Sequence, residues 1–502
     1  MRRWGWGRSA RTDRGWEGWA MTARRPNILL VVSDHHSGYA FGPNSGVETP
    51  HMLRLAAEGL SFTELRTPCP MCAPARAGLM SALYPHANGM WNNNHTRAAM
   101  RRDLVPGVRL WSENLADDGY RLRYVGKWHV SAERSPARFG WEEFQPAPPP
   151  ADRLSHVDVL RQEREGWPPR VVYATSTGPV EAINDARVTS TAVECIEAGA
   201  RDAEPWCLFV GWTHPHDPYV AHERYLARYA PGSVRPPANA SDALVDKPNI
   251  YRRLHEQLWD QLSPAQLAET IRHYRAMITF LDDQLGRLLA ALERSGQAED
   301  TLVVYTSDHG DYAGAHGLFA KGVPAFDEAY RVPFVVRWPA GIQGAGREVD
   351  AFASLLDVGP TLLEAAGAPG LTDVHGRSLL PWLRGETPSA WPDAFHGEFL
   401  GHENLYTQRL VRTRRHKYVW NAFDYDELYD LEADPHEMVN RVADPACDGA
   451  RRELIRRIWD WVDATDDVIR GGTYPMNAIL PLGPRLEAAR TVAGGTKETN
   501  GG

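Results

Sequence analysis

Cysteine is scarce in this sequence, and long apolar segments are missing from it. The chain has 502 residues and five cysteines, which are Cys69, Cys72, Cys195, Cys207 and Cys447. Because they are few, odd in number and scattered, we expect no disulfide framework and a reducing compartment. No segment is apolar for long enough to span a bilayer, and the first 20 residues hold four tryptophans but no apolar run of signal-peptide length. These absences predict a soluble, cytoplasmic protein without a membrane partner.

An excess of positive charge is also absent. Lys and Arg number 55 against 64 Asp and Glu, which gives a net charge of −9 and argues against a nucleic-acid partner. A small anionic substrate needs only local positive charge, so this class of ligand stays open. Hydrophobic residues make up 43% of the chain, enough for a large core, and the length suggests two or three structural units.

Short apolar runs are typical of strands that are buried on both faces of a parallel sheet. They lie at 27–32, 121–125, 206–211, 301–305 and 332–336. A helix is predicted from Ser263 to Gly296, because Ser263, Pro264 and Gln266 form a strong start signal and apolar residues then follow a helical period. Strands that alternate with helices predict an α/β fold with a mainly parallel sheet.

The pattern changes after about residue 370. Short strands at 395–399, 410–413 and 417–420, followed by a helix at 453–462, predict a smaller α+β subdomain. The proline-rich stretches 136–150 and 231–242 are expected to be irregular loops. The predicted organisation is a tail over 1–21, an α/β domain over 22–370, the α+β subdomain over 371–470 and an extended tail over 471–502.

One thiol has a tightly specified local setting. Pro74 can open a helix, because its missing N–H has no partner there in any case, so Cys72 would lie at a helix N-terminus. Arg76 lies four residues after Cys72 and can fork onto an oxyanion. Cys72 is therefore the candidate nucleophile.

Polar residues follow the predicted strands at the sheet edge where α/β proteins bind ligands. They are Asp34, Lys127 with His129, His216, and Asp308 with His309, and Lys321 follows a glycine-bearing loop. Each of them alone has a structural explanation, such as a helix cap or an exposed lysine. Together, Asp34 and Asp308 offer hard oxygen ligands for a divalent cation, and neighbouring cations would attract a sulfate or phosphate ester.

Three other roles for the cysteine motif are a redox pair, a structural zinc site and a non-catalytic anion-binding site. Cys69 and Cys72 match a Cys-x-x-Cys redox motif, although nothing around them resembles a thioredoxin-like unit. Structural zinc would need a second cysteine pair, which the sequence does not offer. A third alternative is a non-catalytic protein that binds anions and keeps its thiol.

From about residue 26 to 442, the chain resembles the type I, formylglycine-dependent sulfatases of the alkaline-phosphatase-like superfamily. The matching segments are 27–34, 72–76, 126–129, 215–218, 306–310 and 428–435. Asp308 is followed by His, and Lys321 lies 13 residues (321 − 308) after Asp308. Both features are similar to the branch that holds choline sulfatases and phosphonate monoester hydrolases.

The resemblance implies a set of roles. Asp34, Asp308, His309 and a formylglycine made from Cys72 would hold one divalent metal, with Ca²⁺ expected before Mn²⁺ or Mg²⁺. Arg76 would steady the formylglycine, and the sulfate would be contacted by Lys127, His129, His216 and Lys321. The branch adds Asn93 as a substrate contact. Family members usually have Asp or Gln where this chain has His35, which is a candidate ligand without an anionic oxygen.

The resemblance also implies an activity and partners. The expected activity is hydrolysis of a sulfate ester, a small molecule, after maturation by a formylglycine-generating enzyme. The alternative is a phosphonate monoester hydrolase or phosphodiesterase, but Lys127 and His129 favour sulfate, because the phosphonate branch tends to have hydroxyl residues there. The branch often forms oligomers, so a homo-oligomer is a further expectation.

Overall fold

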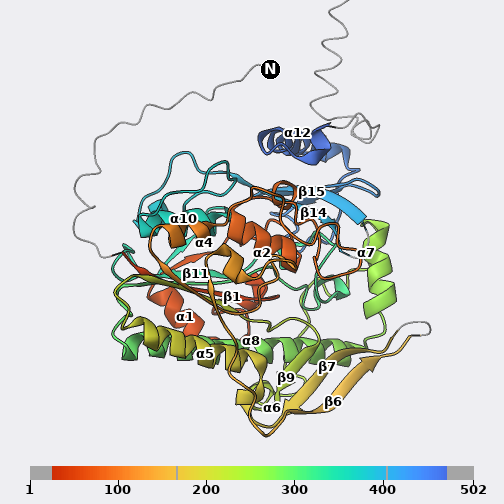
Figure 1. The fold of residues 1–502 in the computed structure, drawn as a ribbon. Helices are drawn as coiled ribbons and strands as arrows, with labels where there is room; N and C mark the ends of the chain where they lie inside the picture. Colours follow the sequence, from red (N-terminus) through yellow and green to blue (C-terminus); the bar gives the residue numbers. More distant parts are fainter. Residues whose placement is uncertain (1–24, 165–167, 403–404, 472–502) are drawn as a thin grey trace, which may run out of the picture.

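The computed structural model describes residues 25–164, 168–402 and 405–471, so the two predicted tails lie outside the described residues except for Gly471. The described part of the chain builds a central sheet of eight strands in the order β12-β2-β11-β10-β1-β8-β4-β5 (Figure 1). In that order they are Arg347–Val349, Leu60–Phe62, Phe334–Arg337, Thr301–Ser307, Asn27–Ser33, Trp206–Gly211, Arg121–Gly126 and Glu142–Phe144.

The centre of this sheet is parallel, as the apolar runs predict. β1 pairs in parallel with β10 on one side and with β8 on the other, and β8 pairs in parallel with β4. All four strands therefore end at one edge. The fifth predicted strand, β11, pairs antiparallel with β10. β5 falls within the proline-rich stretch expected to be irregular, where it pairs with β4 at the sheet margin.

Helices cover both faces of the sheet, which divides the core into two layers (Figure 1). Alternate residues of β1 point to opposite faces, because strand side chains alternate. Leu29 and Val31 pack against α1 (Pro50–Ala57), α5 (Asn184–Gly199) and α8 (Pro264–Arg294). Ile28, Leu30 and Val32 pack against α2 (Cys72–Ser81), α4 (Trp111–Asp117) and α10 (Val358–Ala366).

The predicted long helix is confirmed as α8, with the capping box that its sequence predicts. Ser263 Oγ accepts a hydrogen bond from Gln266 N, and the Gln266 side chain accepts one from Ser263 N. Although α8 has 31 residues, no helix in the described ranges is both long and apolar enough to cross a membrane.

A second, antiparallel sheet follows the α/β part. It has the order β14-β15-β16-β17, with bounds Ala394–Gly401, Leu405–Thr413, His416–Asn421 and Glu427–Asp430. α12 (Asp448–Ala464) packs on it and lies at the top of Figure 1 beside β14 and β15. These elements confirm a smaller C-terminal α+β unit, while the exact boundary at residue 370 stays a prediction.

A third sheet has no counterpart among the predicted strands. β6 (Ser155–Gln162) and β7 (Arg170–Thr177) form an antiparallel pair, and β7 pairs in parallel with β9 (Tyr219–His222). Most of β6 is exposed, so its sequence does not show the apolar pattern of a buried strand. This sheet places the start of β7 beside the loop that follows β8.

Candidate active site

The parallel strands bring the predicted polar residues to one edge of the sheet. Backbone hydrogen bonds join the segments just beyond the strand ends. Asp308 N donates to Ser33 O at 3.2 Å, and Asp34 N donates to His214 O at 3.2 Å. Lys127 N donates to Gly211 O at 2.9 Å. Residues from positions far apart in the sequence therefore share one rigid edge.

Two glycines allow the ends of β4 and β8 to approach closely. Gly126 has a φ of 97°, and a Cβ added to it would lie 2.0 Å from Gly211 O. A Cβ added to Gly211 would lie 2.4 Å from Lys127 O. Only glycine fits such contacts, so this pair fixes where the chain turns into Lys127.

Helix α2 carries Cys72 and Arg76 into the same edge. The helix begins at Cys72, as predicted, and all ten of its residues are buried. Arg76 Nε donates to Asp308 Oδ2 at 2.7 Å, and Arg76 Nη1 donates to Lys127 O at 3.0 Å. Ala73 N donates to Asn93 Oδ1 at 3.1 Å, so Asn93 also holds the start of the helix.

Four predicted metal ligands form one buried group. The ligand atoms of Asp34, Cys72, Asp308 and His309 all lie within 4.8 Å of one another. The Cys72 sulfur is 3.7 Å from Asp34 Oδ1 and 3.2 Å from His309 Nε2. Two carboxylates and an imidazole suit a divalent cation, so the donor set fits the expected metal.

Both histidines next to the carboxylates present Nε2 to this group. His309 Nδ1 lies 2.8 Å from Gly310 O, and His35 Nδ1 lies 2.8 Å from Asp311 Oδ2. Each Nδ1 therefore carries a proton, which leaves Nε2 as the nitrogen that can bind a metal once it holds no proton itself.

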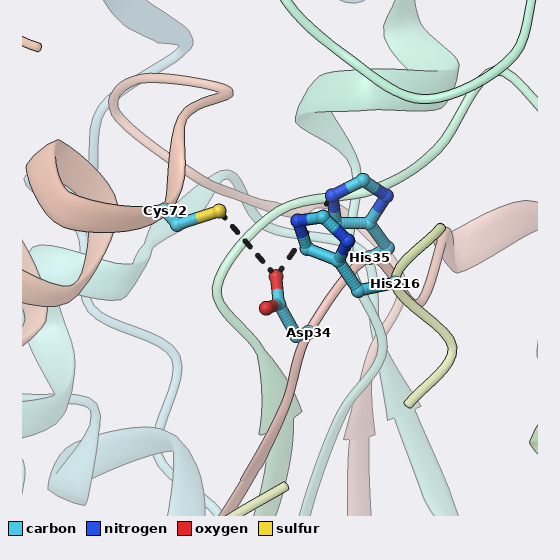
Figure 2. A group of neighbouring side chains, drawn as sticks. All are labelled: Asp34, His35, Cys72 and His216. Carbon is cyan, nitrogen blue, oxygen red and sulfur yellow. Dashed lines mark hydrogen bonds and ion pairs between the residues drawn. The ribbon is translucent and has the colours of Figure 1, made fainter. Parts of the chain in front are cut away.

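His35 lies close to both Asp34 and Cys72. The ligand atoms of Asp34, His35, Cys72 and His216 all lie within 4.8 Å of one another, and Figure 2 shows the sulfur and the two imidazoles gathered around the Asp34 carboxylate. His35 Nε2 is 4.0 Å from Asp34 Oδ1 and 2.5 Å from Lys321 Nζ. The position is compatible with a metal ligand, and the ligand role stays a prediction.

Positive charge surrounds Cys72. Burial alone would raise the pKa of the Cys72 thiol, but Lys127, Lys321 and His309 outweigh it and hold this pKa well below its usual value. Burial and then the charge of Glu398 hold the pKa of Cys69 well above its usual value. All five cysteines are free, so the redox alternative gains no support from Cys69.

A cavity of about 820 Å³ opens above this group. Its lining includes the predicted residues Cys72, Asn93, Lys127, His129, His216 and Lys321. Lys321 Nζ lies 2.9 Å from His216 Nε2, and Lys127 contacts the Asp34 carboxylate. His129 Nδ1 and Asn94 Nδ2 are buried without a hydrogen-bond partner among the described residues. These two orphaned atoms suit a polar group bound in the cavity.

Sequence reasoning missed several residues of this site. His95 Nδ1 lies 2.6 Å from His129 Nε2, although its loop matches only a glycosylation pattern in the sequence. Asp311 Oδ2 contacts His35 Nδ1. Asp311 lies three residues after Asp308, so its place just after a predicted strand was the sequence signal that could have identified it. Arg170 and Asp217 line the cavity as an ion pair, which no sequence spacing indicates.

Comparisons with known proteins agree with this geometry. A family model described as Sulfatase matches residues 26–368, and one described as N-sulphoglucosamine sulphohydrolase, C-terminal, matches residues 314–463. The chain is 31% identical over 469 residues to the uncharacterised sulfatase YidJ of Escherichia coli strain K12, covering 89% of both chains. It is 29% identical over 488 residues to the choline-sulfatase of Rhizobium meliloti strain 1021, covering 90% of both.

A solved structure shows the same fold. The phosphonate monoester hydrolase of Agrobacterium radiobacter matches with a TM-score of 0.73 and 24% identity. The match covers 88% of this chain and 96% of that chain. At this identity the likeness carries the fold and no detail of the reaction.

Proposed function

Because the chain belongs to the sulfatase family and hydrolyses sulfate esters, we propose that it does so with a formylglycine made from Cys72 and one bound divalent metal. The resemblance found in the sequence and the alkaline-phosphatase-like fold are confirmed by the family match and the structural neighbour. The observation that carries the proposal is the buried group of Asp34, Cys72, Asp308 and His309, whose ligand atoms lie within 4.8 Å of one another.

Formylglycine, as its hydrate, would supply a hydroxyl nucleophile, and the metal would act as a Lewis acid that polarises the oxygens it binds. Asp34, Asp308, His309 and position 72 would hold the metal, with His35 as a further ligand. Two carboxylates favour Ca²⁺ as the ion, with Mn²⁺ or Mg²⁺ as alternatives.

Cations along the cavity would bind the sulfate and stabilise its developing charge. Lys127 and Lys321 face the group at Cys72 and lower its pKa, which supports their role as anion ligands. Arg76 fixes Asp308 through its hydrogen bond of 2.7 Å. Asn93 lines the same cavity and would contact the substrate.

Two histidines suit the proton transfers. Burial and Lys321 lower the pKa of His216, but negative charge at Asp34 and Cys72 outweighs them and raises it to about 9. The Asp34 carboxylate thus favours the protonated form of His216, which is suited, with Lys321, to protonate the leaving alkoxide. His129 lines the cavity, and its Nδ1 has no hydrogen-bond partner among the described residues, so it is suited to accept the proton whose removal releases sulfate.

The first test is maturation. Mass spectrometry of the peptide that contains Cys72, from protein made in its native host, should show an aldehyde in place of the thiol. Cys69 is an internal control, because its thiol should stay intact. A thiol at position 72 in active enzyme from the native host would refute the proposal.

The second test is Cys72→Ser. Serine offers one hydroxyl, so the variant should be sulfated once and then fail to turn over, because no second hydroxyl is available to expel sulfate. Equal steady-state rates for wild type and Cys72→Ser would contradict the aldehyde mechanism. Comparing an aryl sulfate with the matching aryl phosphonate would separate this activity from that of a phosphonate monoester hydrolase.

Location and partners complete the proposal. The five unpaired cysteines support a cytoplasmic location. Cys72, Pro74 and Arg76 would be read by a formylglycine-generating enzyme before the chain folds. The homo-oligomer suggested by the sequence stays a prediction.

A further inference from the structure

Part of the lining of the cavity above Cys72 is apolar. This apolar wall consists of Leu254, Leu258, Trp259, Leu318 and Phe319. The first three come from α7 (Asn249–Leu254) and the π-helix η4 (His255–Trp259) that continues it. Trp259 and Phe319 pack with ring centroids 5.3 Å apart. This wall is where the organic half of a bound ester would lie.

Charge on the cavity lining is unbalanced. Lys127, Lys321 and Arg170 are the lysine and arginine residues of this lining, and Asp217 is its only carboxylate among the described residues. A cationic organic group is recognised either by a free carboxylate or by open aromatic faces. The state of Asp217 and of Trp259 therefore decides whether this cavity accepts a cation.

Neither the Asp217 carboxylate nor the Trp259 ring is free to bind a cation. Arg170 Nη2 donates to Asp217 Oδ2 at 2.6 Å, and His216 Nδ1 lies 3.3 Å from Asp217 Oδ1. The guanidinium of Arg170 also lies over the Trp259 ring, 4.9 Å from its centroid. One residue thus neutralises the carboxylate and covers the indole with a positive charge.

We propose, on the basis of the function proposed above, that Arg170 makes the enzyme select sulfate esters with an uncharged or anionic organic group and reject quaternary ammonium esters. Arg170 lines the cavity and is about a third exposed, at 36% of its side chain, so it is not buried by its partners. Only one of its five N–H donors is used by Asp217, and the others suit a hydroxyl or carboxylate of the substrate.

The test uses three aryl sulfates whose para positions are neutral, anionic and cationic. They are phenyl sulfate, 4-carboxyphenyl sulfate and 4-(trimethylammonio)phenyl sulfate. For wild type, kcat/KM should be higher for the carboxylate ester than for the ammonium ester. A tenfold difference corresponds to about 1.4 kcal/mol of discrimination between the two esters. A wild-type preference for the ammonium ester would overturn the inference.

Variants at the ion pair should move this ratio in opposite directions. Arg170→Gln uncovers Trp259 and frees Asp217, so the ratio of carboxylate to ammonium ester should fall by about tenfold or more. Asp217→Asn leaves Arg170 unpaired, so the ratio should rise. Arg170→Lys keeps the charge and is the matched control, with a ratio near that of wild type.

We compare ratios of kcat/KM because Asp217 is next to His216. A loss of rate that is the same for all the esters cancels in such a ratio. A ratio unchanged in both Arg170→Gln and Asp217→Asn would refute the role of Arg170. If Arg170→Gln does not fold, Asp217→Asn still gives a signed result. Wild-type enzyme that hydrolyses none of the three esters but cleaves the matching phosphonates would instead refute the proposed function.

Discussion

At the scale of single residues, His95 is the side chain that most needs an explanation. It is exposed, yet its Nδ1 lies 2.6 Å from His129 Nε2, with ring centroids 4.6 Å apart. His129 has a φ of 58°, so its backbone is held in an uncommon conformation at this point. The hydrogen bond between His95 Nδ1 and His129 Nε2 therefore holds the imidazole whose Nδ1 has no partner among the described residues.

We expect His95→Ala to lower kcat by about tenfold, part of the 10²- to 10⁴-fold that a placed acid or base contributes, with KM little changed. The His95→Asn variant places an amide where Nδ1 lies and should recover most of the rate, whereas His95→Gln mimics Nε2 and should not. Steady-state kinetics of the three variants is the measurement. In a His129→Ala background, His95→Ala should have no further effect, and an additive loss would contradict the positioning role.

His35 and Asp311 give a second expectation at this scale. If His35 is a ligand, Asp311 is the partner that fixes its tautomer, and Asp311→Asn should weaken Ca²⁺ or Mn²⁺ binding by about 10- to 100-fold. Tyr219→Phe is the control, because the Tyr219 hydroxyl donates to the same Asp311 oxygen at 2.9 Å without contacting the metal group. Metal titration by calorimetry measures the effect. Unchanged affinity in His35→Ala and in Asp311→Asn would remove His35 from the ligand set.

At the scale of elements, the close approach of β4 and β8 is the feature on which Lys127 depends. A Cβ on Gly211 would lie 2.4 Å from Lys127 O, the same oxygen that accepts a hydrogen bond from Arg76. We expect Gly211→Ala to cost about 1–3 kcal/mol of unfolding free energy through overpacking. It should also lower kcat/KM, because Lys127 and Arg76 must move together.

The control for this prediction is Gly370→Ala. A Cβ on Gly370 has nothing within 4 Å, so the variant should change stability by less than about 0.5 kcal/mol and leave the kinetics unchanged. Urea denaturation and steady-state kinetics measure both variants. Wild-type behaviour of Gly211→Ala would show that the strand ends are more adaptable than their contact implies.

The elements also show which parts of the fold a sequence can reveal. β1, β8 and β10 are buried on both faces, and their continuous apolar runs predicted them and the edge at which Asp34 and Asp308 meet. β6 is exposed along most of its length, so it has neither an apolar run nor a clean alternation. For this reason Arg170, at the start of β7, could not be placed beside Trp259 before the structure was known.

At the scale of the whole molecule, a buried ion network joins the α/β part to the C-terminal unit. His86 Nδ1 lies 2.7 Å from Glu398 Oε2, and Arg409 binds both oxygens of Asp467 at 2.6 and 2.8 Å. Burial lowers the pKa of His86, but Glu398 and Asp467 outweigh it and raise this pKa above its usual value. The network comes from four separate segments of the chain.

This network predicts a dependence of stability on pH. Because the pKa of His86 is raised in the folded state, its stabilising effect is complete below its unfolded pKa of about 6.5 and is lost as pH rises through the folded value. The unfolding free energy of wild type should therefore fall above about pH 6.5 more steeply than that of His86→Gln. Urea denaturation across this range measures the difference, and parallel pH curves would contradict the prediction.

The sequence predicts the fold more completely than it predicts the contacts within the site. Motif spacing and the family resemblance predicted the α/β architecture and named the group around Cys72. They did not predict side-chain partners such as His95 for His129, because loop paths decide those contacts. The predicted tails outside residues 25–471 and the domain boundary at 370 stay predictions.

If Cys72 is converted to formylglycine as we propose, the order of the ligands along the chain would set a time limit on that conversion. In the folded chain Cys72 is 1% exposed and touches His309, which is synthesised with Asp308, the latter 236 residues (308 − 72) after the thiol. At about 5–20 residues per second, this leaves roughly 10 to 50 s between the appearance of the thiol and that of the residues that enclose it. The fraction of chains that become active would then depend on whether Cys72 is converted before the residues that enclose it are made and fold around it.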